Sequence, residues 1–345
     1  MNKINLNNRI IWIDLVKAIG IILVIIGHGI QEYNLNMNFL EVIIYSMHMP
    51  LFFIVSGYLF KYHSEVNLKD TIKKKFKKMI IPYICFALII TFFHLIKCII
   101  LKSDYEFFEK LLSKEGIVQS LLCTTKSSYS NLWFLPSLFI SEIMFFIIFR
   151  IFKNEKQRAI VCVVLSTIII CIRKITYIIL PFSMESAIYA LMYLYIGHYF
   201  RINNCLNKIK KNIYTYFFSL IFIFTNVIYY YLTKGKVCNF YNLDIKYPIM
   251  FFITSISGTI CVINLCKKID GNSLLVYIGK NTLYIYGLHF IFQNAISIII
   301  SRVLISKLLV IIITTVMNLI MCLGAIKSFD FIKRKLEIKN ENINY

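Results

Sequence analysis

The stretch WIDLVKAIGIILVIIGHG, residues 12–29, decides the fold. It is long enough and apolar enough to cross a bilayer as a helix, yet it contains Asp14, Lys17 and His28. An ionisable group at bilayer depth is costly, so it usually faces the interior of a helix bundle and marks a functional site. The sequence therefore predicts that this segment is a membrane-spanning helix with a functional face.

Helical geometry places the three ionisable residues on one face of this segment. At about 100° per residue, Lys17 and His28 differ by about 20° in azimuth, and Asp14 lies within about 60° of both. A rise of about 1.5 Å per residue separates Lys17 from His28 by roughly 16 Å along the helix axis. A single polar stripe on an otherwise apolar helix is typical of the wall of a buried passage.

The composition extends this prediction to the whole chain. The protein has 345 residues, of which 59% are hydrophobic, and a mean hydropathy of +0.71. Its long apolar runs do not alternate with period two, which excludes a β-barrel. We expect an all-α, polytopic transmembrane bundle of about ten spans, in a single domain over 1–345 with its core at about 9–326. The predicted spans are 11–30, 39–60, 79–101, 132–152, 159–173, 182–200, 213–232, 248–266, 282–300 and 307–326.

The net charge of +21 orients this bundle. If the amino terminus lies inside the cell, most of the 38 Lys and Arg residues fall in the cytoplasmic segments. This distribution is the positive-inside signature and predicts that both termini are cytoplasmic. The excess charge would then contact anionic membrane lipid, so we do not expect nucleic acid as a partner. Asp14 and Lys17 interrupt the apolar run, which excludes a cleaved signal peptide.

The second predicted span contains the stretch SMHMPLFFIVSGYLF, residues 46–60, with His48, Pro50 and Ser56 close together. A proline inside a span removes a backbone hydrogen bond and can bend the helix beside the histidine. Two interpretations are open: the wall of a cavity that contains a functional histidine, or a tolerated proline kink with a histidine satisfied in the core.

A dense basic cluster follows at residues 73–78, where every residue except Phe76 is lysine. It is either an anchor to anionic lipid or a docking patch for a phosphate-bearing cytoplasmic substrate, because phosphates require clustered donors and positive charge. In the second interpretation Lys74, Lys75 and Lys78 bind the substrate. Pro82 is expected in the first turn of the helix that follows.

Three later residues are further candidates for substrate binding. Trp133 begins a span and is also typical of an interfacial anchor. Glu142 lies well inside the same span and requires a partner that the sequence does not identify, and His289 again lies at depth. The ten cysteines show no metal-ligand spacing, although Cys123 and Cys238 are both expected on the outer side and could pair if that side is oxidising.

The motif inventory leaves histidine chemistry as the main possibility. The chain has no P-loop, no GxGxxG turn, no HExxH helix and no GxSxG elbow. A metal site would require His28, His48 and His289 to converge from three helices, and we expect none. A neutral imidazole can accept a proton from a hydroxyl and return it later, so His28 is predicted to be a general base.

The order of motifs resembles the acyltransferase family 3 membrane proteins, in particular the branch described as fucose 4-O-acetylase-like. These motifs are Lys17 and His28 with ten residues between them, HMPLFFIVSGYLF at 48–60, a basic loop that ends in IIPY, LWFLPSLFI at 132–140, and IGKNTLYIYGLH at 278–289. Many relatives have arginine in place of Lys17, and an Arg-x-x-Arg pair where this chain has Lys75 and Lys78.

The resemblance implies a function and assigns roles. It implies a membrane O-acyltransferase that moves an acetyl group from acetyl-CoA to a hydroxyl of a cell-envelope glycan or lipid-linked sugar, with no permanently bound cofactor. The abundance of Ile, Lys and Asn is typical of a genome low in G and C, so we expect the plasma membrane of a bacterium. Lys17 and His28 would be the catalytic pair, with Asp14 beside Lys17. His48, Ser56 and Glu142 would orient His28 or the substrate. The alternative is a transporter or flippase of a glycan precursor, although the chain shows no internal half-repeat.

Overall fold

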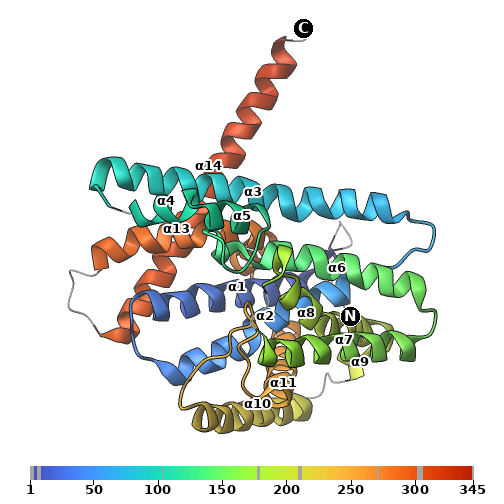
Figure 1. The fold of residues 1–345 in the computed structure, drawn as a ribbon. Coiled ribbons are helices and arrows are strands. Elements are labelled where there is room, and N and C mark those ends of the chain that lie inside the picture. The colour runs from blue at the N-terminus through green and yellow to red at the C-terminus, as the bar shows by residue number, and fades with distance from the viewer. Residues whose placement is uncertain are drawn as a thin grey trace. The chain divides into compact units, whose positions relative to one another are not determined.

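In the computed structural model the protein is almost entirely helical, and the structure describes residues 4–5, 9–103, 105–176, 179–208, 212–269, 272–300 and 306–343. Two short strands near the amino terminus pair in antiparallel orientation. The elements in chain order are β1 (Ile4–Asn5), β2 (Arg9–Ile10), α1 (Ile11–Glu32), α2 (Asn38–Leu59), α3 (Leu68–Leu101), α4 (Tyr105–Leu112), α5 (Lys114–Leu121), η1 (Ser130–Leu132), α6 (Phe134–Ile151), α7 (Glu155–Ile175), η2 (Pro181–Ser183), α8 (Met184–Ile202), α9 (Cys205–Lys208), α10 (Asn212–Thr233), α11 (Pro248–Lys268), α12 (Ser273–Lys280), α13 (Thr282–Ile300) and α14 (Lys307–Ile343). Figure 1 shows their courses.

Each predicted span overlaps a long helix. Among the described residues, seven of these helices are long and apolar enough to cross a membrane by length and composition. They are α1, α2, α3, α6 with η1, α10, α11 and α14. The prediction of a helical, multi-pass membrane protein is therefore confirmed, whereas the full number of ten spans and the cytoplasmic position of the termini remain predictions.

The chain forms two compact units. The first, which we call the terminal unit, combines residues 1–37 with residues 270–345, and the second, the central unit, contains residues 38–269. The terminal unit therefore brings α1 together with α12, α13 and α14 from the opposite end of the chain. Of the predicted site residues, Asp14, Lys17, His28 and His289 belong to the terminal unit and the others to the central unit.

In the terminal unit a glycine permits close contact between α1 and α12. A Cβ placed on Gly279 would lie 1.9 Å from the backbone oxygen of Asp14, much closer than real Cβ atoms approach backbone. Any larger residue would therefore push α12 away from the segment of α1 that contains Asp14 and Lys17.

The central unit is held together by a similar contact between α2 and α8. A Cβ on Gly57 would lie 2.0 Å from the carbonyl oxygen of Leu194, and a Cβ on Gly197 would lie 1.9 Å from that of Ile54. Small residues at such positions let membrane helices approach closely, which increases their van der Waals contact. The reciprocal pair fixes α2, and with it Ser56, against α8.

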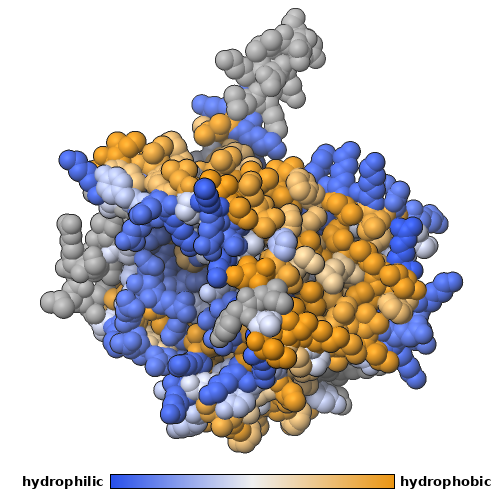
Figure 2. All heavy atoms as spheres, in the orientation of Figure 1, coloured by the Kyte–Doolittle hydropathy of each residue, from blue (hydrophilic) through white to orange (hydrophobic). Residues whose placement is uncertain are grey.

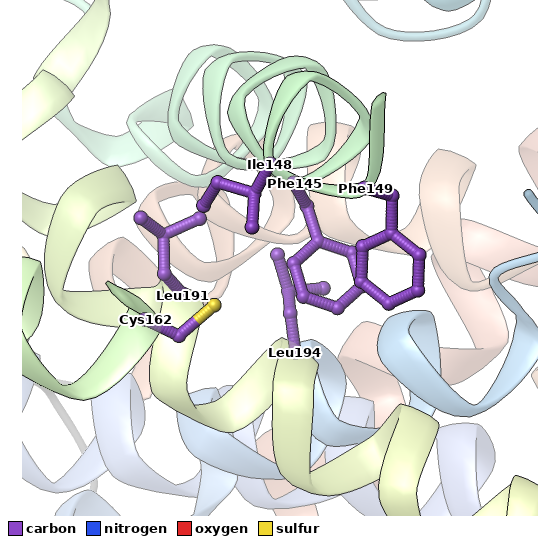
Figure 3. Close-up of a cluster of buried hydrophobic side chains, with 6 residues drawn as sticks. All are labelled: Phe145, Ile148, Phe149, Cys162, Leu191 and Leu194. Atoms are coloured by element: carbon purple, nitrogen blue, oxygen red, sulfur yellow. The ribbon is translucent and has the colours of Figure 1, made fainter. Parts of the chain in front are cut away.

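The core of the central unit continues through α6, α7 and α8. Figure 3 shows six buried side chains that interlock there, with the rings of Phe145 and Phe149 side by side at 4.8 Å between centroids. Helix α6 contributes half of this cluster, and its opposite side faces α3. The packing therefore fixes α6, the helix that contains Glu142. The six residues are Phe145, Ile148, Phe149, Cys162, Leu191 and Leu194.

Helix α3 differs from its predicted span. It begins at Leu68, where the side chain of Asn67 accepts a hydrogen bond from the backbone N–H of Lys69, so the basic cluster is helical and not part of a loop. Pro82 consequently lies inside α3, and its prediction in a first helical turn is wrong. The physical reason is that a capped, lysine-rich segment continues a helix well beyond the end of the apolar run. Figure 2 shows hydrophilic atoms over the amino-terminal part of α3 and hydrophobic atoms over the rest.

Candidate functional site

Two of the three ionisable residues of helix α1, Asp14 and Lys17, form an ion pair. Lys17 Nζ lies 3.1 Å from Asp14 Oδ1, and Asp14 is buried at 3% exposure. This ion pair is the neutralising contact that a spacing of three residues permits. The structure therefore gives the buried Asp14 carboxylate a cationic partner, and the catalytic role of Lys17 stays a prediction.

His28 lies toward the other end of α1 and is half-buried against α13. Its ring centroid is 5.6 Å from that of His289 and 4.6 Å from that of Phe290. Since α13 begins more than 240 residues after His28, only the fold brings the two imidazoles together. Two sequence-predicted site residues, His28 and His289, therefore form one group.

Polar side chains that the sequence did not single out extend this group. Asn318 on α14 donates from Nδ2 to the backbone oxygen of His289 at 2.8 Å. Gln293, one turn after His289 on α13, is buried, and its backbone oxygen accepts from the Tyr33 hydroxyl at 3.3 Å. Amides inside apolar spans are the signal that could have found both residues.

Among the described residues, no group of three His, Cys, Asp or Glu side chains lies close enough together to hold a metal ion. The two imidazoles of the terminal unit can hold protons and hydrogen bonds.

The central unit contains a second polar group, centred on Glu142. The Glu142 side chain is 8% exposed. Its Oε1 accepts a hydrogen bond from the Ser56 hydroxyl, and its Oε2 forms an ion pair with the Lys75 ammonium. The partner that Glu142 requires at membrane depth is thus Lys75, and three helices meet at this carboxylate. Three residues predicted to bind or orient the substrate are brought together, although each also has the structural task of satisfying the others.

The other lysines of the basic cluster face away from Glu142. Lys73, Lys74, Lys77 and Lys78 are exposed, whereas the Lys75 side chain is only 24% exposed. Lys74 and Lys78 lie four residues apart and so share a face of α3. The cluster therefore presents free-standing ammonium groups on a regular helical surface, suitable for either lipid or phosphate.

His48 is a buried residue of α2, at 4% exposure. Its Nδ1 donates to the backbone oxygen of Ile44 at 2.7 Å, and its ring packs edge-on against Tyr45 at 4.9 Å between centroids. The backbone thus satisfies one of the two ring nitrogens, and the role of His48 beside His28 or the substrate stays a prediction. Helix α2 passes through Pro50 without a break.

Trp133 stands where η1 joins α6 and packs on the connection between α10 and α11. Its ring stacks on Phe240 at 6.1 Å between centroids with 27° between planes, and it also contacts Tyr241. Phe240 is buried and stacks in turn on Phe53 at 5.4 Å. Trp133 is therefore part of an aromatic cluster that fastens this connection to the helices of the central unit.

Cys123 and Cys238, for which pairing was left open, are both free thiols and both buried. The Cys238 thiol lies in the connection between α10 and α11, where burial raises its pKa to about 12. A thiol with such a pKa is inert near neutral pH.

Comparison with known proteins identifies the family. The family model described as an acyltransferase domain matches residues 10–327, which covers both units. Comparisons with curated proteins and with solved structures found no match. The match extends over nearly the whole chain, and with the membrane helices and the histidine pair it gives a plain conclusion: this chain belongs to acyltransferase family 3 and is a multi-pass membrane acyltransferase.

Proposed function

We propose that the protein transfers an acetyl group from acetyl-CoA to a hydroxyl of a cell-envelope glycan or lipid-linked sugar, in the plasma membrane of a bacterium, with His28 as general base. Membership of the family supports acyl transfer as the reaction class. The observation that supports the histidine is its position on a membrane helix, 5.6 Å between ring centroids from His289 and only partly buried. Such a position suits an imidazole that exchanges protons with a bound hydroxyl.

The reaction balances with one base. The imidazole of His28 takes the proton of the acceptor hydroxyl while the hydroxyl oxygen bonds to the carbonyl carbon of the thioester. The carbon–sulfur bond then breaks, and the imidazolium returns the proton to the sulfur of the departing CoA. No net proton is gained or lost by the protein, so His28 is ready for another turnover.

Cationic residues are proposed to bind the donor. CoA carries several phosphate charges, and the exposed ammonium groups of Lys74 and Lys78 on α3 are suited to bind them. Lys75 adds a cation whose position is fixed by Glu142. In the terminal unit, the Lys17–Asp14 pair is proposed to order the chain at the end of α1 opposite His28.

The proposal is tested with the full-length protein in lipid nanodiscs, supplied with labelled acetyl-CoA and envelope glycan from the source cells. General-base help is worth roughly 10²- to 10⁴-fold in rate, so His28→Ala should lower transfer at least about 100-fold without loss of protein from the membrane. His63→Ala, which changes an exposed histidine, is the matched control. Transfer by His28→Ala at the rate of His63→Ala would remove His28 from its role, and movement of unmodified glycan without acetylation would favour a transporter.

A further inference from the structure

Two buried hydrogen-bond acceptors lie beside His28. His289 is 0% exposed and Gln293 3% exposed, and neither His289 Nε2 nor Gln293 Oε1 has a hydrogen-bond partner among the described residues. His289 and Gln293 are four residues apart on α13 and so share a face of that helix. Buried polar atoms nearly always have partners, so two unpartnered atoms on one face indicate a bound group.

The hydrogen-bonding character of His289 follows from its other nitrogen. His289 Nδ1 lies 2.7 Å from the backbone oxygen of Tyr286. A carbonyl oxygen can only accept, so Nδ1 carries the hydrogen, and Nε2 of the neutral ring is left with a lone pair. Gln293 Oε1 is likewise an acceptor.

Neighbouring helices of the terminal unit hold the backbone at both residues. Asn318 on α14 binds the backbone of His289, and Tyr33 at the end of α1 binds that of Gln293. Gly29 lies opposite Gln293, since a Cβ placed there would be 3.4 Å from Gln293 Nε2. Groups held this firmly favour a ligand of matching geometry.

The chemistry of the two acceptors selects the kind of ligand. A phosphate oxygen, a carboxylate or a thioester carbonyl has no hydrogen to donate, so none of these groups can satisfy His289 Nε2 or Gln293 Oε1. Hydroxyl groups donate, and a sugar ring presents several on adjacent carbons. We infer that His289 and Gln293 each accept a hydrogen bond from a different hydroxyl close to the one that is acylated, so that the chain acts on a sugar with several neighbouring hydroxyls and not on an isolated alcohol.

This inference rests on the proposed function, because it places the acceptor beside His28. It adds that Gln293 determines which acceptors are used. A site built to hydrogen-bond a hydroxyl strongly rejects an analogue without it, because its own polar groups are then left unpaired. Specificity for an acceptor with neighbouring hydroxyls is therefore expected from the protein, independently of how the donor is bound.

The kinetic test compares three variants in nanodiscs with labelled acetyl-CoA and envelope glycan. Gln293→Met keeps the size of the side chain but removes the acceptor oxygen, and we expect a KM for the glycan about tenfold higher, with the KM for acetyl-CoA unchanged. Gln293→Glu keeps an acceptor oxygen and should restore most of the affinity. Asn294→Met changes the neighbouring amide, which bonds to the backbone of Phe290, and is the matched control.

A binding test separates this inference from the proposed function. Methyl glycosides of common hexoses at about 100 mM, and their deoxy analogues that lack one ring hydroxyl, are added without acetyl-CoA, and the thermal midpoint is recorded. At least one glycoside should raise the midpoint of the wild type and of Asn294→Met, but not that of Gln293→Met. No rise in the wild type, or an equal rise in Gln293→Met, overturns the inference even if acetylation occurs. A glycoside-dependent rise without any acetyl transfer supports the inference and overturns the proposed function.

Discussion

Replacement of Glu142 by alanine removes the carboxylate at which three helices of the central unit meet. The Lys75 ammonium and the Ser56 hydroxyl both lose their acceptor. Loss of one member of a buried ion pair typically costs about 3–5 kcal/mol, because the remaining charge is left without a partner. Lys75 is 24% exposed and can be partly solvated, so we expect a loss near the lower end, about 3 kcal/mol.

The double variant Lys75→Met/Glu142→Leu distinguishes the contribution of the two charges to stability from that of side-chain packing. Both charges are then gone and the volumes are roughly kept, so the unfolding free energy should lie within about 1 kcal/mol of the wild type. A double-mutant cycle should therefore show strong coupling between the two positions. Lys74→Met removes an exposed cation one residue away and should cost no more than about 0.5 kcal/mol.

The assay is reversible unfolding by SDS in bicelles, followed by the fluorescence of the two tryptophans. Two results would refute the reasoning. One is a Glu142→Ala variant as stable as Lys74→Met, which would mean that the carboxylate contributes nothing. The other is a double variant that loses the sum of the two single losses, which would mean that the two side chains act independently.

Two further predictions concern single positions. Gly279→Ala should destabilise the terminal unit by about 1–3 kcal/mol, because its Cβ would overlap the backbone of Asp14, whereas Gly324→Ala on α14, with nothing within 4 Å, should be neutral or stabilising by up to about 1 kcal/mol; equal midpoints in the SDS titration would contradict this. Cys238 should resist alkylation by iodoacetamide at pH 8 until SDS is added, because burial raises its pKa to about 12. The protonated thiol should also stabilise the fold at pH values below its unfolded pKa of about 8.5. This stabilisation should be lost as the pH rises from about 8.5 toward 12. Labelling of the native Cys238 at the rate of the denatured chain, read by mass spectrometry, would show that the thiol is accessible.

The sequence predicted the long helices because hydropathy alone defines them in a membrane protein. All ten predicted spans overlap helices, and the first begins at the predicted residue, Ile11. The errors lie at the ends of the helices, because a helix can continue beyond the apolar run that predicts it. Helix α3 starts at Leu68 and α14 continues to Ile343, since polar residues with good helix propensity extend a helix past the bilayer boundary.

The candidate site was predictable as a set of residues but only partly as a set of contacts. Ionisable side chains inside apolar runs are visible in the sequence, which is why Asp14, Lys17, His28 and His289 were identified. The ion pair between Asp14 and Lys17 is local and follows from their spacing. The contact between His28 and His289 is not local, because nothing in the sequence states which of many helices packs against α1.

The contact between Glu142 and Lys75 is not local, but the periodicity of α3 indicates which lysine makes it. From the sequence alone, any of the five lysines at 73–78 could pair with Glu142. In the structure, α3 buries Met79, Tyr83 and Phe86, which recur at spacings of four and three residues. Four residues before Met79, this stripe reaches Lys75. The lysine that pairs with Glu142 therefore follows the same periodicity that packs α3 against α6, and the other four lysines are left exposed.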